Sequence, residues 1–300
     1  MELPFYHIGE LAALGAAFLW AVATVLFRRI GFEIPPLLLN LLKGLVSLLL
    51  VGPTLLLTQE SHTPVEPAGW LLLLLSGVFG IGCGDTFFFA SLNRIGEGRS
   101  VLIVETVAPL FATLFSMGFL YEFLPLQGFL GIAVTVAGVG WVLAERTTPS
   151  DGARRRAKRG ILLGLAAAFF QAVGSVLSRA AFLHTEITPM WSTLIRLIGG
   201  NLFLLVFISL RGQALFPRAL MSLKIWTFIL AATFFGTYLG ILFQQISLKY
   251  TSAGIAQTLM GTSALFVLPF TLLRGERVSL RAVLGALVAL CGIFLLFSLK

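Results

Sequence analysis

Four charged side chains lie inside long apolar runs of this 300-residue sequence: Lys43, Asp85, Glu105 and Arg196. A charge in an apolar environment is costly, so such residues are candidates for a functional site and usually face a partner in the protein interior. Lys43 and Arg196 together suit a carboxylate or phosphate on a ligand. Arg196 is the stronger anchor, because its guanidinium offers two donors at once. The alternative is an internal set of ion pairs, since two cations and two carboxylates sum to zero.

Asp85 follows a run with four glycines between residues 77 and 84. This glycine density lets another backbone approach closely. The Asp85 carboxylate could bind a substrate amine or take up a proton. The alternative is structural, with Asp85 paired to Lys43 or capping the nearby loop together with Arg94.

Glu105 lies one turn before Pro109, on the same face of a predicted helix. A proline inside a membrane helix frees a backbone carbonyl, which often marks a hinge or a binding surface. The plainer alternative is that Glu105 lies near the membrane interface and pairs with Arg99 or Arg94.

Uncharged polar and aromatic side chains complete the candidate site: Trp20, Phe88, Gln171, Ser175, Tyr238, Gln244 and Gln245. Neither a metal nor a cofactor is expected, because the three histidines lie in separate loops without metal-ligand spacing. The two cysteines, Cys83 and Cys291, lie in apolar runs and are expected to act as small buried hydrophobes.

The elements that must position these residues are membrane helices. Hydrophobic residues make up 58% of the chain and charged residues 11%, whereas soluble domains are about 45–50% apolar. The runs are continuous and rich in Leu, Ala and Gly, as in bundled membrane helices and unlike outer-membrane strands. We therefore expect an all-α integral membrane protein with ten spans: 9–28, 35–57, 69–92, 99–120, 126–144, 160–180, 190–210, 224–246, 253–273 and 280–298.

The first span returns near the middle of the chain. Residues 14–28, LGAAFLWAVATVLFR, match residues 165–179, LAAAFFQAVGSVLSR, at nine of fifteen positions. The match continues, because Lys43 falls opposite Arg196, and the glycines at 80 and 84 fall opposite those at 236 and 240. The chain is therefore expected to hold one five-helix repeat at 1–148, a basic linker at 149–159 and a second repeat at 160–300.

Five is an odd number, so the second repeat is expected to cross the membrane in the opposite sense to the first. Inverted repeats of this kind are typical of secondary transporters, in which a site near the membrane centre opens alternately to each side. No GxxxxGK[ST] nucleotide-binding pattern occurs, and no nucleophile, metal cluster or carboxylate pair is arranged for catalysis. We expect a transporter and not an enzyme, with a membrane-embedded lipid-modifying enzyme as the alternative from another class.

Residues 84–122, with Asp85, Pro109 and Glu122 at the marked positions, resemble the third and fourth spans of a known family. Together with the paired repeats, they make the chain similar to the ten-span EamA-type permeases of the drug/metabolite transporter superfamily. The resemblance implies transport, often export, of small metabolites such as amino acids or related carboxylates, in the cell (inner) membrane. The expected partners are that metabolite and the lipid bilayer, without nucleic acid, and a homodimer is left open.

A proton-coupled multidrug exporter is the alternative within transport. Related four-span exporters carry a proton-exchanging Glu near the middle of the first span, where this chain has Trp20 and, in the second repeat, Gln171. Neither side chain can titrate, so any proton coupling would depend on Asp85 or Glu105. We further expect Glu122 and Glu276, which lie at loop ends beside basic residues, to be structural anchors.

The loops give an orientation that differs from the family pattern. On the side shared by the termini they hold three Lys and Arg residues, and on the other side sixteen. By the positive-inside rule both termini should face away from the cytoplasm. Members of the resembled family usually keep both termini in the cytoplasm.

Overall fold

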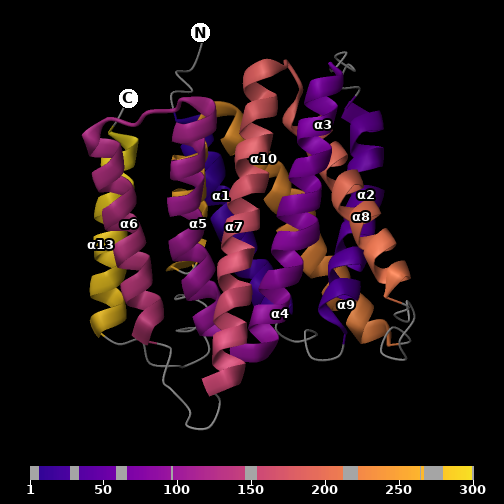
Figure 1. Ribbon diagram of the computed structural model, residues 1–300, viewed down its shortest axis with the longest axis horizontal. Coiled ribbons are helices and arrows are strands. Elements are labelled where there is room, and N and C mark those ends of the chain that lie inside the picture. Colours follow the sequence, from indigo (N-terminus) through magenta and orange to yellow (C-terminus); the bar gives the residue numbers. More distant parts are fainter. Residues whose placement is uncertain are drawn as a thin grey trace.

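The computed structural model describes residues 7–27, 34–58, 66–95, 97–145, 154–211, 222–263, 265–266 and 280–298. All the regular structure in these residues is helical, and the helices run side by side along a common direction (Figure 1). In chain order the helices are α1 (Ile8–Phe27), α2 (Pro36–Thr58), α3 (Pro67–Ser76), η1 (Gly77–Asp85), α4 (Thr86–Ile95), α5 (Glu97–Leu120), α6 (Leu126–Glu145), α7 (Arg154–His184), α8 (Pro189–Leu210), α9 (Leu223–Thr233), η3 (Phe234–Leu239), α10 (Gly240–Tyr250), α11 (Ala253–Met260) and α13 (Leu280–Phe297).

Six of the described helices are long and apolar enough to cross a membrane: Pro36–Thr58, Pro67–Ile95, Ser100–Leu120, Lys158–His184, Pro189–Leu210 and Leu223–Tyr250. Three shorter apolar helices accompany them: Ile8–Thr24, Leu126–Trp141 and Val283–Phe297. These nine coincide with nine of the expected spans, and the chain is an integral membrane protein. Of the ninth expected span, 253–273, the structure describes α11 at its start, and residues 267–273 lie outside the described part.

Two of the long helices contain π-helical segments, which the sequence analysis did not anticipate. η1 lies between α3 and α4, and η3 lies between α9 and α10. The two segments occupy corresponding positions in the two matched halves of the sequence. A π-helical turn widens the helix and is frequently found at functional sites.

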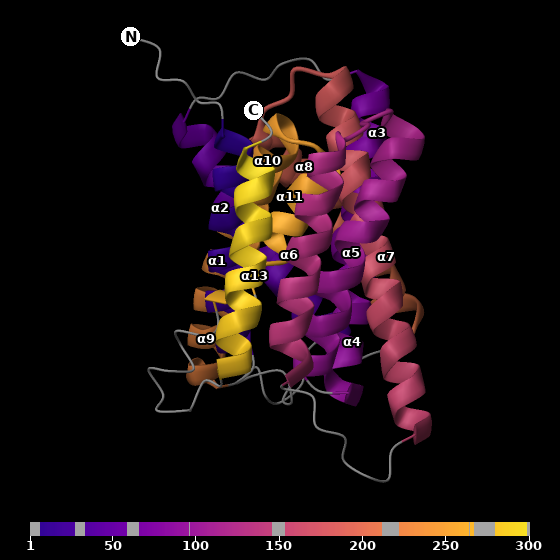
Figure 2. The ribbon, with the colours of Figure 1, turned by 90° about the vertical axis from the view of Figure 1, so that its left-hand side faces the viewer.

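Helix packing is repeated between the two halves. α1 packs along α9, η3 and α10, and α7 packs along α3, η1 and α4. α2 packs against α8, whereas α6 and α13 form a pair at one edge of the bundle (Figures 1 and 2).

Small residues allow close helix packing at corresponding positions of the two halves, between η1 and α7 in one case and between η3 and α1 in the other. A Cβ on Gly80 in η1 would lie 3.6 Å from the Gly174 Cα of α7, and one on Gly236 in η3 would lie 2.5 Å from the Ala23 Cβ of α1. One turn further, a Cβ on Gly84 would lie 2.9 Å from the Gln171 side chain. One on Gly240 would correspondingly lie 2.6 Å from Trp20 Nε1.

The α6–α13 pair shows the same reciprocity. A Cβ on Gly138 would lie 2.7 Å from the Gly285 carbonyl oxygen, and one on Gly292 would lie 2.9 Å from the Gly131 carbonyl oxygen. Close backbone approach at small residues is the usual way in which membrane helices pack tightly.

Glu122 holds several helices together where α5 ends. Its Oε1 accepts a hydrogen bond of 2.6 Å from Arg179 Nε of α7, and its Oε2 accepts one of 3.2 Å from the Ala253 backbone N–H at the start of α11. Arg179 also donates to the carbonyls of Leu248 and Lys249 at the end of α10. Glu122 is therefore a structural anchor between α5, α7 and α11, as expected. Glu276 lies outside the described residues.

Candidate functional site

Lys43 and Asp85 form an ion pair between α2 and the last residue of η1. The Lys43 side chain is 8% exposed and that of Asp85 is 23% exposed, so both lie largely out of contact with solvent. The Lys43 ammonium also lies 5.2 Å from the centre of the Phe89 ring on α4. Of the two structural alternatives for Asp85, the structure shows the pairing with Lys43. Arg94, the other expected partner, donates to the Ala90 carbonyl.

Arg196 lies buried on α8 beside this pair, with 2% of its surface exposed. Its Nη1 donates a hydrogen bond of 3.0 Å to Gln244 Oε1 on α10, and its guanidinium interacts electrostatically with Asp85. Its Nε is buried and has no hydrogen-bond partner among the described residues. An unpaired buried donor is costly, so an acceptor placed beside this N–H would stabilise it.

The glycines of η1 make room for Arg196. A Cβ on Gly77 would overlap with the Arg196 carbonyl oxygen, and one on Gly80 would lie 3.0 Å from Nη2. α8 therefore crosses η1 at a distance that a larger residue at position 77 would prevent. The crossing brings Arg196, from the second half of the chain, next to Asp85, from the first half.

The cluster has an excess of positive charge. In their ordinary ionised forms Lys43 and Arg196 supply two positive charges and Asp85 supplies one negative charge. Glu105 belongs to a different contact, because its Oε1 accepts a hydrogen bond of 2.9 Å from Ser263 Oγ, beyond the end of α11. The four charged residues therefore do not form one neutral set, which changes the charge balance expected from the sequence.

The pairing of Glu105 also differs from the alternative considered for it. Among the described residues Glu105 bonds Ser263 and not Arg94, because Arg94 donates to the Ala90 carbonyl. The side chain of Arg99 lies outside the described residues.

Trp20 contacts η3, Gln171 contacts η1, and Tyr238 belongs to η3 itself. Trp20 Nε1 donates a hydrogen bond of 2.9 Å to the Gly236 carbonyl within η3. Gln171 packs against Gly84 of η1. The Tyr238 hydroxyl shares a hydrogen bond of 2.8 Å with Thr54 Oγ1 on α2. These residues thus support the segments next to the charged cluster.

The remaining polar candidates bridge neighbouring helices. Ser175 donates to Gln257 Oε1 over 3.0 Å, and Gln245 Oε1 accepts a bond of 2.8 Å from Ser192. Phe88 packs at a tilt against Phe89. Among the described residues, no three His, Cys, Asp or Glu side chains gather closely enough to hold a metal ion.

Asn40 is a site residue that the sequence analysis missed. It is fully buried, and its Nδ2 donates to the Ile81 carbonyl of η1 over 2.7 Å and to Thr86 Oγ1 over 3.0 Å. These bonds hold α2 against the π-helical segment that ends at Asp85. A signal was present, because Asn40 precedes Lys43 by three positions and so shares its helix face.

Three relatives with curated descriptions cover most of the chain. A protein of Methanothermobacter thermautotrophicus described as an uncharacterized transporter is 26% identical over 79% of this chain and 67% of its own length. The uncharacterized transporter YoaV of Bacillus subtilis is 23% identical over 95% of both chains. A probable amino-acid metabolite efflux pump of Salmonella typhimurium is 25% identical over 94% of this chain and 92% of its own length.

A solved crystal structure shares the fold, with a TM-score of 0.77 and 17% sequence identity over 97% of both chains. The model of the EamA-like transporter family matches residues 7–144 and again residues 158–298. The two matches together cover nearly all of the sequence and divide it where the sequence repeat divides it. This chain is a member of the EamA-like transporter family.

Proposed function

We propose that this membrane transporter is a secondary permease that moves a small carboxylate-bearing metabolite across the cell membrane by alternating access. The observation that carries the proposal is Arg196: a buried guanidinium with one unpaired N–H, next to an ion pair that leaves one positive charge in excess. A substrate carboxylate would complete the hydrogen bonding of Arg196 and neutralise the cluster.

Amino acids and related metabolites fit this cluster. Their carboxylate matches Arg196, and an amine could share Asp85 with Lys43, its bonded partner among the described residues. A metabolite with a net negative charge would also neutralise the cluster. The description of the Salmonella typhimurium relative as a probable amino-acid metabolite efflux pump agrees with this substrate class.

Alternating access is supported by the reciprocal contacts of the two halves. Trp20 contacts Gly240 as Gln171 contacts Gly84, and Gly138 approaches α13 as Gly292 approaches α6. Such reciprocity is expected if two five-helix repeats, at 1–148 and 160–300, are related by a two-fold axis in the membrane plane. The charged cluster joins α2 and η1 of one repeat to α8 and α10 of the other, so rocking of the repeats would open it to either side.

The test is transport in sealed proteoliposomes with radiolabelled amino acids and other small carboxylates. Arg196→Gln should strongly reduce transport of the acidic substrate at low substrate concentration while the protein still inserts in the membrane. Loss of one charged hydrogen-bonding partner costs about 1.5–3 kcal/mol, which is roughly a tenfold to hundredfold weakening of binding.

Arg159→Gln is the matched control, because Arg159 is exposed near the start of α7 and far in sequence from the cluster. It should transport at the wild-type rate. Retained affinity of Arg196→Gln for the carboxylate would reject the anchoring role. Turnover of a lipid without movement of any metabolite would reject transport in favour of an enzyme.

A further inference from the structure

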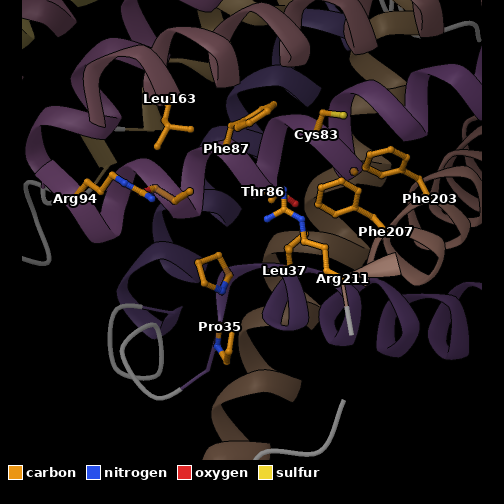
Figure 3. A pocket seen from close by; sticks show the side chains of 13 residues that line it. Pro35, Leu37, Cys83, Thr86, Phe87, Arg94, Leu163, Phe203, Phe207 and Arg211 are labelled. Atoms are coloured by element: carbon orange, nitrogen blue, oxygen red, sulfur yellow. The ribbon is translucent and has the colours of Figure 1, made fainter. Parts of the chain in front are cut away.

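A separate pocket of about 430 Å³ opens between α4 and α8, and the start of α2 also lines it (Figure 3). Its volume lies in the range of about 300–1,000 Å³ that is usual for ligand sites. None of the charged residues of the cluster described above lines it. The lining residues are Pro35, Pro36, Leu37, Gly82, Cys83, Thr86, Phe87, Ala90, Arg94, Leu163, Phe203, Phe207 and Arg211.

The walls of the pocket are mostly apolar, and the charged residues among the described ones that line it are two arginines. Phe87 faces Phe203 and Phe207 across the space, as Figure 3 shows. The Arg211 guanidinium lies 4.5 Å from the centre of the Phe207 ring, and Arg94 folds back along α4 to the Ala90 carbonyl. Neither arginine pairs with a carboxylate among the described residues.

The pocket lies at the end of the bundle where α4 and α8 finish. Gly160 near the start of α7 packs against Ile95 and Arg94 at the end of α4, so α7 begins at this same end. The first residues of α7 are three consecutive arginines, 154–156, so the sequence is strongly basic here. Basic pockets between membrane helices at a basic face are suited to anionic lipid headgroups.

We propose that this pocket binds an anionic phospholipid from the surrounding membrane. Its phosphate accepts hydrogen bonds from Arg94 and Arg211 at the rim, where both guanidiniums are exposed to the headgroup region. Part of one acyl chain lies along the wall formed by Phe87, Phe203 and Phe207. The combination of a paired positive rim and an apolar interior requires a ligand that is anionic at one end and apolar at the other.

The test measures lipid binding to the purified full-length protein in detergent by native mass spectrometry, with dioleoyl phosphatidylglycerol against dioleoyl phosphatidylcholine. The wild type should retain phosphatidylglycerol in preference. Each arginine near an anionic headgroup contributes enough to change binding about fivefold, so Arg94→Gln with Arg211→Gln should weaken it about thirtyfold. Both side chains are exposed, so the double variant should keep its melting temperature without lipid.

Two further variants separate the parts of the site. Arg159→Gln, at the same end of the bundle but outside the pocket, should bind phosphatidylglycerol as the wild type does. Ala90→Trp keeps both arginines and fills the pocket, and it should weaken binding of the lipid. Equal retention of both lipids, unchanged binding by the double arginine variant, or competition by free glycerol 3-phosphate at the concentration of the lipid would each overturn the proposal.

Discussion

Asp85 has two cationic neighbours, and only Lys43 bonds it directly among the described residues. The unpaired Nε of Arg196 shows that the arginine is not fully satisfied by Gln244 and the nearby carboxylate. At the scale of single residues, the cluster therefore resembles a site that is charged and oriented before a ligand arrives. Preorganised donors of this kind reduce the cost of binding, because little has to be ordered when the ligand enters.

Asp85→Asn should destabilise the protein. Removal of one partner of a buried ion pair costs about 3–5 kcal/mol, because it leaves the other charge uncompensated. We expect a lower melting temperature in detergent, measured by tryptophan fluorescence. Replacing both partners, as Lys43→Met with Asp85→Leu, should recover most of the stability but not transport. A melting temperature of Asp85→Asn equal to that of the wild type would show that the pair is not needed to keep Lys43 buried.

At the scale of elements, the crossing of η1 and α8 positions the cluster. The crossing depends on glycines on both helices. A Cβ on Gly200 of α8 would lie 3.0 Å from the Gly77 carbonyl oxygen, just as Gly77 of η1 leaves room for the Arg196 carbonyl. The π-helical turns of η1 widen the helix at this crossing. Asn40 then ties α2 to η1, so that three helices present their charged residues at one level.

Gly77→Ala should separate the two helices. The added methyl group would overlap with backbone that cannot easily move away, and overpacking typically costs about 1–3 kcal/mol, or more where the backbone has to shift. We expect poor folding and low yield, measured as the monodisperse fraction after solubilisation. Gly52→Ala on α2 is the matched control, because no atom lies within 4 Å of the added Cβ there. Equal yields of the two variants would mean that α8 does not need this close approach.

Across the whole molecule, the two ends of the helix bundle differ in the number of positively charged loop residues expected there. α1 begins and α13 ends at one end of the bundle, whereas α4 and α8 end at the other (Figure 1). By the spans expected from the sequence, sixteen of the loop cations belong to the loops of the second end and three to those of the first. The positive-inside rule places that end in the cytoplasm, which would also put the proposed lipid pocket in the cytoplasmic leaflet.

A reporter fused after Lys300 should therefore lie outside the cytoplasm. Alkaline phosphatase should be active there, whereas green fluorescent protein should be dark when exported unfolded. The reverse pattern would place both termini in the cytoplasm. It would mean that another signal overrides the loop charges of this chain.

Composition and residue spacing were enough to predict the membrane setting, nine of the expected helices and the correspondence between the two halves of the chain. These features depend on composition and on the spacing of residues along one helix, both of which are local. Lys43 and Arg196 could be matched because each lies at the same place in its own repeat.

Which helix faces meet could not be predicted in this way and is seen in the folded structure. It paired Asp85 with Lys43 and separated Glu105, which bonds Ser263. It also brought Asn40 to η1 and left a donor of Arg196 unpaired. The physical reason is that helical spacing tells which residues share a face, whereas the neighbour of that face is set by crossings between distant helices. Those crossings depend here on close backbone contacts at glycine and on the π-helical turns, and neither is visible in hydrophobic periodicity.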